Sequence, residues 1–191
     1  CRPRDRDLNM RNLTHVEGMS LNALRAGIDW GFESFPEYLD LLESKGVGLN
    51  VACFVGHSSI RTYVLGEDAS KREANQDEIK QMKKLVVEAL ESGACGFSTT
   101  RSIQHNGEAG IPMPSRLASE QELLSLAGCL KETRKGIQMM TKDGERTTIK
   151  SIERLAQAAE KPYLVAALLH SNIKPESTFQ DLDNISKAHE N

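Results

Sequence analysis

The sequence predicts an α/β fold of about four consecutive βα units around a parallel sheet. Short apolar runs of strand length alternate with segments of helical periodicity, capping motifs precede several of those segments, and glycines lie at the junctions. The 191 residues are enough for one domain with a sizeable core. A closed eight-stranded barrel needs about 250 residues. The pattern therefore indicates either about half of such a barrel or a complete small open sheet.

Three capping boxes mark where helices are expected to begin. In each of them a Ser or Asn is followed three residues later by a Glu: Ser34 with Glu37, Asn75 with Glu78, and Ser119 with Glu122. The strongest apolar stripe follows the second box and consists of Ile79, Met82, Leu85, Val86, Ala89 and Leu90. Further helices are expected over 20–26 and 149–159 and from about residue 177 onward, with a short helical turn over 60–65. Residues 1–18 are polar and are expected to be irregular.

Four apolar runs are predicted to be strands. They cover residues 47–55, 94–99, 137–140 and 163–169. They are mostly apolar rather than alternating, which is typical of strands that are buried on both faces of a parallel sheet. In βα folds ligands bind at the C-terminal ends of the strands. The polar residues that directly follow these runs are therefore the candidate functional residues.

Composition excludes several classes of function. The formal net charge is 24 − 27 = −3 and aromatic residues make up only 5%, so neither nucleic acid nor an anionic membrane surface is expected as a partner. No apolar run approaches the roughly 20 residues that span a bilayer. The first residues are charged and precede no apolar core, unlike a signal peptide. The four cysteines form no CxxC pair; reduced thiols and a cytoplasmic location are expected.

Polar side chains that follow the predicted strands could carry the chemistry. His57 comes after the first strand and could bind a metal, move protons, hold substrate or simply brace the next loop; Arg61 could bind a carboxylate or form an ion pair. Ser98 lies at the end of the second strand and Arg101 just after it, and both suit an anionic or amide substrate. His170 ends the fourth strand and could ligate a metal or cap the strand.

Several familiar catalytic motifs are missing from the sequence. No Gly-x-Ser-x-Gly surrounds the serines, so a serine nucleophile is not expected. Neither a Walker A motif nor GxGxxG follows a strand, and no HExxH occurs. The residues by themselves thus indicate an enzyme-like βα domain without specifying a reaction.

Two segments resemble the D-aminoacylase (N-acyl-D-amino-acid deacylase) family of the amidohydrolases. Residues 47–61 look like that family's Asn-Val-Ala strand followed by a Gly-His-x-x-(hydrophobic)-Arg loop, and residues 88–99 resemble its Gly-Ala-x-Gly-Phe-Ser-Thr signature. The order and spacing of the two also match, and residues 114–123 look like the next loop and helix of the family. The resemblance is clear over roughly 18–135.

The resemblance implies a partial (β/α)8 TIM-type barrel, with 1–191 as the central part of one amidohydrolase barrel domain that is truncated at both ends. It implies a hydrolase that uses a divalent metal, expected to be zinc, to cleave the amide bond of N-acyl-D-amino acids or similar small amides. His57, Arg61, Ser98 and Arg101 are then expected to line the active site, and His170 falls near a metal-ligand position. No catalytic residue is assigned within the chain, which is expected to be inactive by itself.

One strand departs from the family pattern. The family carries a histidine after its fifth barrel strand, whereas the corresponding run here ends Met139-Met140-Thr141. Two alternatives therefore stay open: a related enzyme that acts on a cyclic amide, and a non-catalytic barrel that binds a small ligand.

Overall fold

A computed structural model of the chain describes residues 1–141, 147–166, 168 and 174–189. Its centre is a four-stranded sheet of β1 (Phe54–Gly56), β2 (Gly96–Thr100), β3 (Ile137–Thr141) and β4 (Tyr163–Val165). All neighbouring strands are parallel and their order is β1-β2-β3-β4. The predicted parallel sheet is confirmed. A doubly wound sheet reverses its strand order at a switch point, and this sheet does not, as in an arc of a barrel.

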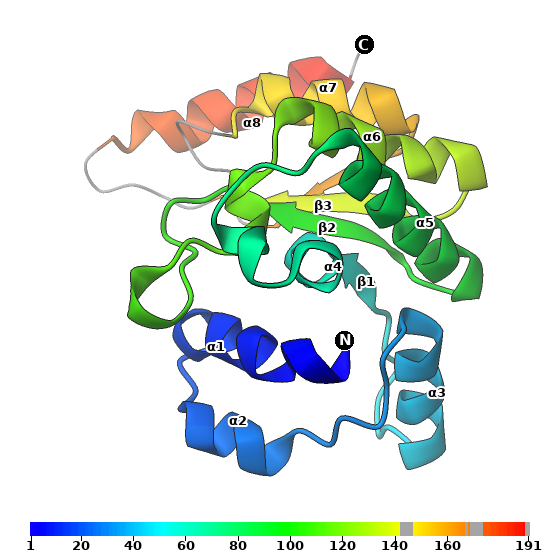
Figure 1. Cartoon of the computed structure of the whole chain (residues 1–191). Helices are drawn as coiled ribbons and strands as arrows, with labels where there is room; N and C mark the ends of the chain where they lie inside the picture. The colour runs from blue at the N-terminus through cyan, green and yellow to red at the C-terminus, as the bar shows by residue number, and fades with distance from the viewer. Residues whose placement is uncertain (142–146, 167, 169–173, 190–191) are drawn as a thin grey trace.

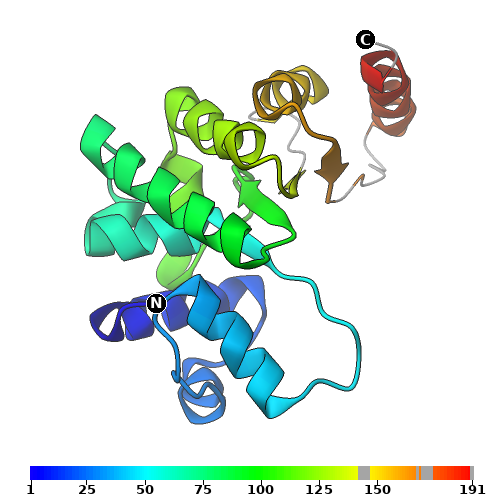
Figure 2. The ribbon, with the colours of Figure 1, turned by 90° about the vertical axis from the view of Figure 1, so that its right-hand side faces the viewer.

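Eight α-helices are found in the described part of the chain (Figures 1 and 2). They are α1 (Arg6–Val16), α2 (Leu21–Gly27), α3 (Phe35–Lys45), α4 (His57–Leu65), α5 (Gln76–Ser92), α6 (Glu120–Thr133), α7 (Ile149–Ala159) and α8 (Glu176–His189). Short 3-10 turns include η2 (Gly66–Ser70) and η4 (Pro114–Leu117). Among the helices of the described residues, none is long and apolar enough to cross a membrane.

Helix α1 corrects the expectation that residues 1–18 are irregular. Its apolar stripe is weak, and this is why periodicity does not reveal it. It is held instead by an ion pair one turn apart, Arg11 to Asp7 at 2.7 Å, and by burial of Met10 and Asn12 against the rest of the chain. A local ion pair and tertiary packing, rather than an apolar stripe, therefore hold this segment as a helix.

The capping boxes place the starts of α3, α5 and α6 as predicted. At α3 and α5 both halves of the box form. At α6 the Ser119 hydroxyl accepts from the Glu122 backbone N–H, but the Glu122 side chain forms its hydrogen bonds with His57 and Arg61. The third capping box is therefore a helix start whose glutamate serves another purpose.

One face of the sheet is covered by α5, α6 and α7 (Figure 1). Val55, Phe97 and Met140 point to this face and are buried with the apolar stripes of the helices in one core. Where α6 leads into β3, Gly136 has a φ of +74°, and a Cβ there would lie 2.8 Å from the Cα of Gly96. Gly96 and Gly136 thus allow the starts of β2 and β3 to approach each other closely.

The first predicted strand, 47–55, is much shorter than expected. Only Phe54–Gly56 forms β1, and 47–53 has no regular structure; Figure 2 shows it as a loop that leads away from the helices. Its side chains Val47, Leu49 and Val51 are 51%, 83% and 54% exposed. Such an apolar run is typical of a strand with neighbouring strands on both sides, whereas β1 is paired with β2 only.

The opposite edge of the sheet also exposes apolar side chains. Leu164 of β4 is 46% exposed, and Phe179 and Leu182 of α8 are 68% and 49% exposed. The predicted fourth strand, 163–169, is observed as Tyr163–Val165, and its last residues lie partly outside the described ones. Exposed apolar side chains thus lie near both edge strands of the sheet, β1 and β4.

We predict that the 191-residue chain, prepared by itself, associates into dimers or larger species. Exposed apolar groups next to unpaired strand edges favour such contacts. Multi-angle light scattering after size exclusion should show a mass that rises with concentration. The double variant Leu49→Lys, Val51→Lys should reduce the association, and a wild-type chain that stays monomeric at all concentrations would contradict the prediction.

Candidate functional site

The C-terminal end of β2 presents its side chains to two different faces of the sheet. Because side chains alternate along a strand, Phe97 and Thr99 point to the helix-covered face, and Ser98 and Thr100 point to the opposite, open face. Ser98 lies beside Gly56 of β1 and Met139 of β3 in the parallel register. Ser98 and Thr100, both half-buried, are thus the polar residues that this strand presents to the open face, and the Thr100 hydroxyl accepts the backbone N–H of Ser102 at 3.2 Å.

A buried hydrogen-bond cluster lies on the helix-covered side of this strand end. The Glu122 carboxylate is hydrogen-bonded to two side chains. Its Oε1 lies 2.7 Å from His57 Nε2, and its Oε2 accepts a hydrogen bond from the Arg61 guanidinium. The other imidazole nitrogen, Nδ1, lies 2.8 Å from the Thr99 hydroxyl. His57 is 1% exposed, and Arg61 and Glu122 are fully buried. We call these four residues the Glu122 cluster.

Two helix starts, those of α4 and α6, bring the Glu122 cluster together at the end of β2. His57 opens α4 directly after β1, and Arg61 follows one turn later on the same helix face. Glu122 lies in the first turn of α6, which the Ser119 cap places. The sequence marks Glu122 only as a capping-box glutamate, because its spacing from Ser119 fits that motif, and gives no signal for a site residue.

Burial and hydrogen bonding set the charges in the cluster. Burial lowers the pKa of His57 and outweighs the hydrogen bond and the charge of Glu122. For Glu122 burial alone would raise the pKa, but the hydrogen bonds and charges of His57 and Arg61 outweigh it and lower the pKa. At neutral pH the cluster therefore consists of a carboxylate, a guanidinium and a neutral imidazole.

The order hydroxyl, imidazole, carboxylate is that of a nucleophilic triad, but the cluster cannot act as one. In a triad the histidine must pass its proton to a leaving group, and the His57 ring is completely enclosed. The Phe97 ring packs against it, with ring centroids 5.3 Å apart. The Glu122 cluster therefore supports the structure around the strand end.

The expectation that His57 and Arg61 line the active site stays a prediction, and the structure shows where the two side chains lie. Both side chains are buried on the helix-covered face, where His57 contacts Thr99 and Phe97 of β2 and Arg61 contacts Glu122. Arg61 uses its other terminal nitrogen on the backbone carbonyls of Ala69 and Arg72, at 3.3 and 2.8 Å. It thereby fixes the turn that follows α4.

Ser98 and Arg101 remain candidates for a site at the strand end. Ser98 points to the open face, and Arg101 follows β2 directly, partly buried, with no hydrogen-bond partner on its Nε. His170 lies outside the described residues, so its role as a metal ligand stays a prediction.

The described residues do not form a metal site by themselves. Among them, no three His, Cys, Asp or Glu side chains cluster closely enough to hold an ion. Both nitrogens of His57 are occupied by Thr99 and Glu122. All four cysteines are free thiols, as predicted.

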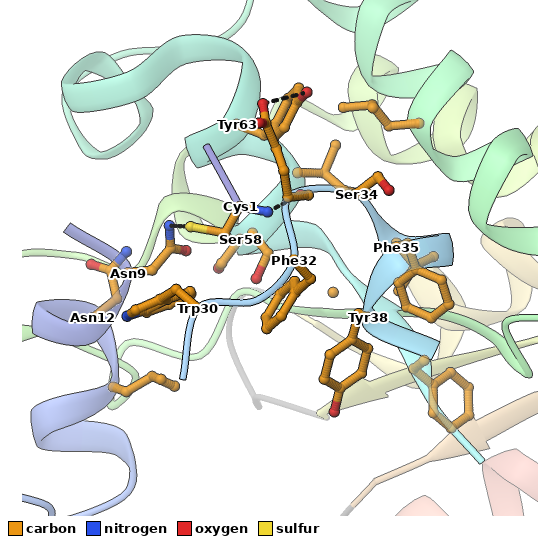
Figure 3. Close-up of a pocket in the computed structure, with 18 of the residues that line it drawn as sticks. Cys1, Asn9, Asn12, Trp30, Phe32, Ser34, Phe35, Tyr38, Ser58 and Tyr63 are labelled. Atoms are coloured by element: carbon orange, nitrogen blue, oxygen red, sulfur yellow. Dashed lines mark hydrogen bonds between the residues drawn. The ribbon is translucent and has the colours of Figure 1, made fainter. Parts of the chain in front are cut away.

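A cavity of about 510 Å³ lies beside β1, and its lining includes the three residues of that strand together with Ser58 and Ser59 after the strand end. Figure 3 shows the aromatic side chains of Trp30, Phe32, Phe35 and Tyr38 along it. Ser58 lines it, but none of His57, Arg61, Ser98 and Arg101 does. In a barrel this is the side on which a further strand would pair with β1, so we do not identify the cavity as the substrate site.

The known proteins that match part of the chain include two deacylases. A D-aminoacylase of Alcaligenes xylosoxydans xylosoxydans is 42% identical over 79 residues, which are 41% of this chain and 16% of that protein. The chain resembles part of the D-aminoacylases. An N-acyl-D-glutamate deacylase of the same organism is 33% identical over 78 residues, again 41% of this chain and 16% of the relative. No protein-family model matches the chain.

Solved structures of D-aminoacylase share the fold. One crystal structure of D-aminoacylase aligns with a TM-score of 0.66 and 25% identity, over 83% of this chain and 32% of that one. Another D-aminoacylase structure, with a TM-score of 0.67, 25% identity and the same coverage, concerns a binuclear metal centre in that enzyme. The predicted partial TIM-type barrel is thereby confirmed. The chain spans about a third of these structures and about a sixth of these curated relatives.

We predict that acid destabilises the fold through the Glu122 cluster. Because the folded-state pKa of His57 is lowered, the unfolded chain takes up a proton first as the pH falls below about 6.5, and stability is lost. The lowered pKa of Glu122 acts in the same direction, with its stabilisation lost as the pH falls below about 4.5.

The thermal unfolding midpoint, followed by circular dichroism, should therefore decrease between pH 7.5 and 5.5. The variant His57→Gln should show a shallower decrease, and the matched variant His15→Gln, at an exposed position of α1, should follow the wild type. Equal slopes in the wild type and His57→Gln would contradict the assignment of a lowered histidine pKa.

Proposed function

We propose that the whole protein is a metal-dependent amidohydrolase that cleaves the amide bond of N-acyl-D-amino acids or similar small amides. The observation that carries this proposal is the shared arc of parallel strands, with 25% identity to a D-aminoacylase structure over 83% of this chain. Two curated relatives, a D-aminoacylase and an N-acyl-D-glutamate deacylase, support the substrate class.

The strand-end residues fit the chemistry of such a substrate. An N-acyl amino acid carries an amide and a carboxylate. The hydroxyls of Ser98 and Thr100 can hydrogen-bond the amide, and the guanidinium of Arg101 can bind the carboxylate in bidentate fashion. Arg101 has an Nε without a partner at the end of β2, which supports this assignment.

A divalent metal, zinc in our proposal, is the cofactor of the whole protein. One structural relative, an N-acyl-D-glutamate deacylase, was solved with zinc and a phosphonate inhibitor. Since the described residues offer no ligand set, the ligands must come from elsewhere in the protein, and His170 is proposed as one of them. We further propose that 1–191 is the central part of one barrel domain and that the protein is cytoplasmic.

Replacement of Arg101 by Met should raise KM for N-acyl-D-amino acids about ten- to a hundredfold, because a charge-assisted hydrogen bond to a carboxylate contributes roughly 1.5–3 kcal/mol. Steady-state kinetics on the whole protein measure this effect. The control Arg154→Met removes an arginine whose exposed ion pair with Glu120 should contribute little. An unchanged KM in Arg101→Met would remove Arg101 from the substrate site.

The experiment that tests the proposed function combines elemental analysis of the whole protein with a substrate panel on the same sample. The panel contains N-acetyl-D-amino acids, their L-enantiomers and cyclic amides. Bound zinc together with release of free amine from the D-compounds alone is the expected result. Turnover of cyclic amides alone would replace the proposal with the related chemistry, and a protein with neither metal nor hydrolysis would be a ligand-binding barrel.

A further inference from the structure

The end of β2 is held by a chain of hydrogen bonds that runs from one helix start to another. We propose that Glu122 and His57 are positioning residues, which orient Thr99 and thereby fix the directions of the Ser98 and Thr100 hydroxyls on the open face. The consequence for catalysis rests on the proposed function, whereas the arrangement of the hydrogen bonds does not.

The direction of the chain follows from the charge of Glu122. An ionised carboxylate only accepts hydrogen bonds, so His57 must donate from Nε2 over the 2.7 Å contact. The neutral ring then has an acceptor at Nδ1, and the Thr99 hydroxyl donates to it at 2.8 Å. One buried carboxylate therefore determines the tautomer of His57 and the orientation of the Thr99 hydroxyl.

Burial prevents water from exchanging the donor and acceptor roles in the hydrogen bonds between Glu122, His57 and Thr99. His57, Arg61 and Glu122 are each at most 1% exposed, so water does not compete for their hydrogen bonds, and in such dry surroundings these bonds are strong. Arg61 supplies the countercharge and is itself held by two backbone carbonyls. The only hydroxyl of the cluster belongs to Thr99, which is half-buried at the strand end.

The strand geometry transmits the position of Thr99 to the open face. Thr99 stands between Ser98 and Thr100, and their side chains point the other way. Phe97, two residues before Thr99, also packs against the His57 ring. The pairing of β2 with β1 and β3 fixes its backbone, and the imidazole that holds both the Phe97 and the Thr99 side chain adds a restraint at the strand end, so the open-face side chains are preorganised.

If Glu122, His57 and Arg61 served only to stabilise the fold, the donor and acceptor roles in their hydrogen bonds would not matter. Apolar residues of similar volume often replace buried ion pairs without loss of stability. The substitution Glu122→Gln separates the two roles. Arg61 still requires an acceptor, so the amide oxygen of Gln turns to Arg61 and its NH2 group faces His57 Nε2. His57 must then carry its proton on Nδ1, and Thr99 changes from donor to acceptor.

The test uses the whole protein with ¹⁵N-labelled histidine. Wild type should show His57 as the neutral Nε2–H tautomer at pH 7.5, and Glu122→Gln should show the Nδ1–H tautomer. The control Glu120→Gln, an exposed residue of the same helix, should leave the tautomer unchanged. An unchanged tautomer in Glu122→Gln would overturn the proposal.

A milder pair of variants covers the case in which Glu122→Gln does not fold. Thr99→Val removes the hydroxyl and keeps the shape, and Thr99→Ser keeps the hydroxyl. Hydrogen exchange of the 96–101 amides should be about tenfold faster in Thr99→Val than in wild type and unchanged in Thr99→Ser. Equal exchange in the two variants would overturn the proposal.

Kinetics separate this proposal from the proposed function. We expect kcat to fall at least tenfold in Thr99→Val, with KM changed less than threefold, and to recover in Thr99→Ser. A wild-type protein that hydrolyses no member of the panel would refute the proposed function, and the tautomer and exchange results would still decide the positioning role. An active wild type with the same kcat in Thr99→Val would refute the positioning role alone.

Discussion

The carboxylate of Glu122 lies between the guanidinium of Arg61 and the imidazole of His57, all three shielded from water. The starts of α4 and α6, the turn after α4 and the end of β2 all meet at this group. A carboxylate buried without partners would be very costly, and a pair broken by loss of one partner typically costs about 3–5 kcal/mol. The loops at this end of the sheet are therefore interdependent.

The second constraint is the arc of the sheet. Its strands are parallel, follow one another without reversal, and expose apolar side chains at both edges, at Leu49 beside β1 and at Leu164 in β4. An arc of this kind divides the two sides of the molecule: helices bury one face, and the other is left to ligands at the strand ends. The strand-end hydroxyls belong to the second side, and the Glu122 cluster to the first.

This division explains why neighbouring residues of β2 have different roles. Ser98 and Thr100 face the open side, where we propose that a substrate binds, whereas Thr99 between them contacts His57 on the other side. A protein site requires side chains whose own positions are fixed by the groups behind them. Here the supporting groups come from α4 and α6, and the two residues in contact, His57 and Glu122, are 65 residues apart along the chain.

The sequence by itself determined the helix starts at Ser34, Asn75 and Ser119 and the parallel sheet, because caps and apolar periodicity are local patterns. It also indicated the family resemblance. Only the tertiary structure decided that α1 is a helix, that 47–53 does not form a strand, and that Glu122 joins His57 rather than its own helix cap. Apart from the local Asp7–Arg11 ion pair of α1, each of these depends on which distant residues pack against the segment, and caps and apolar periodicity do not specify those partners.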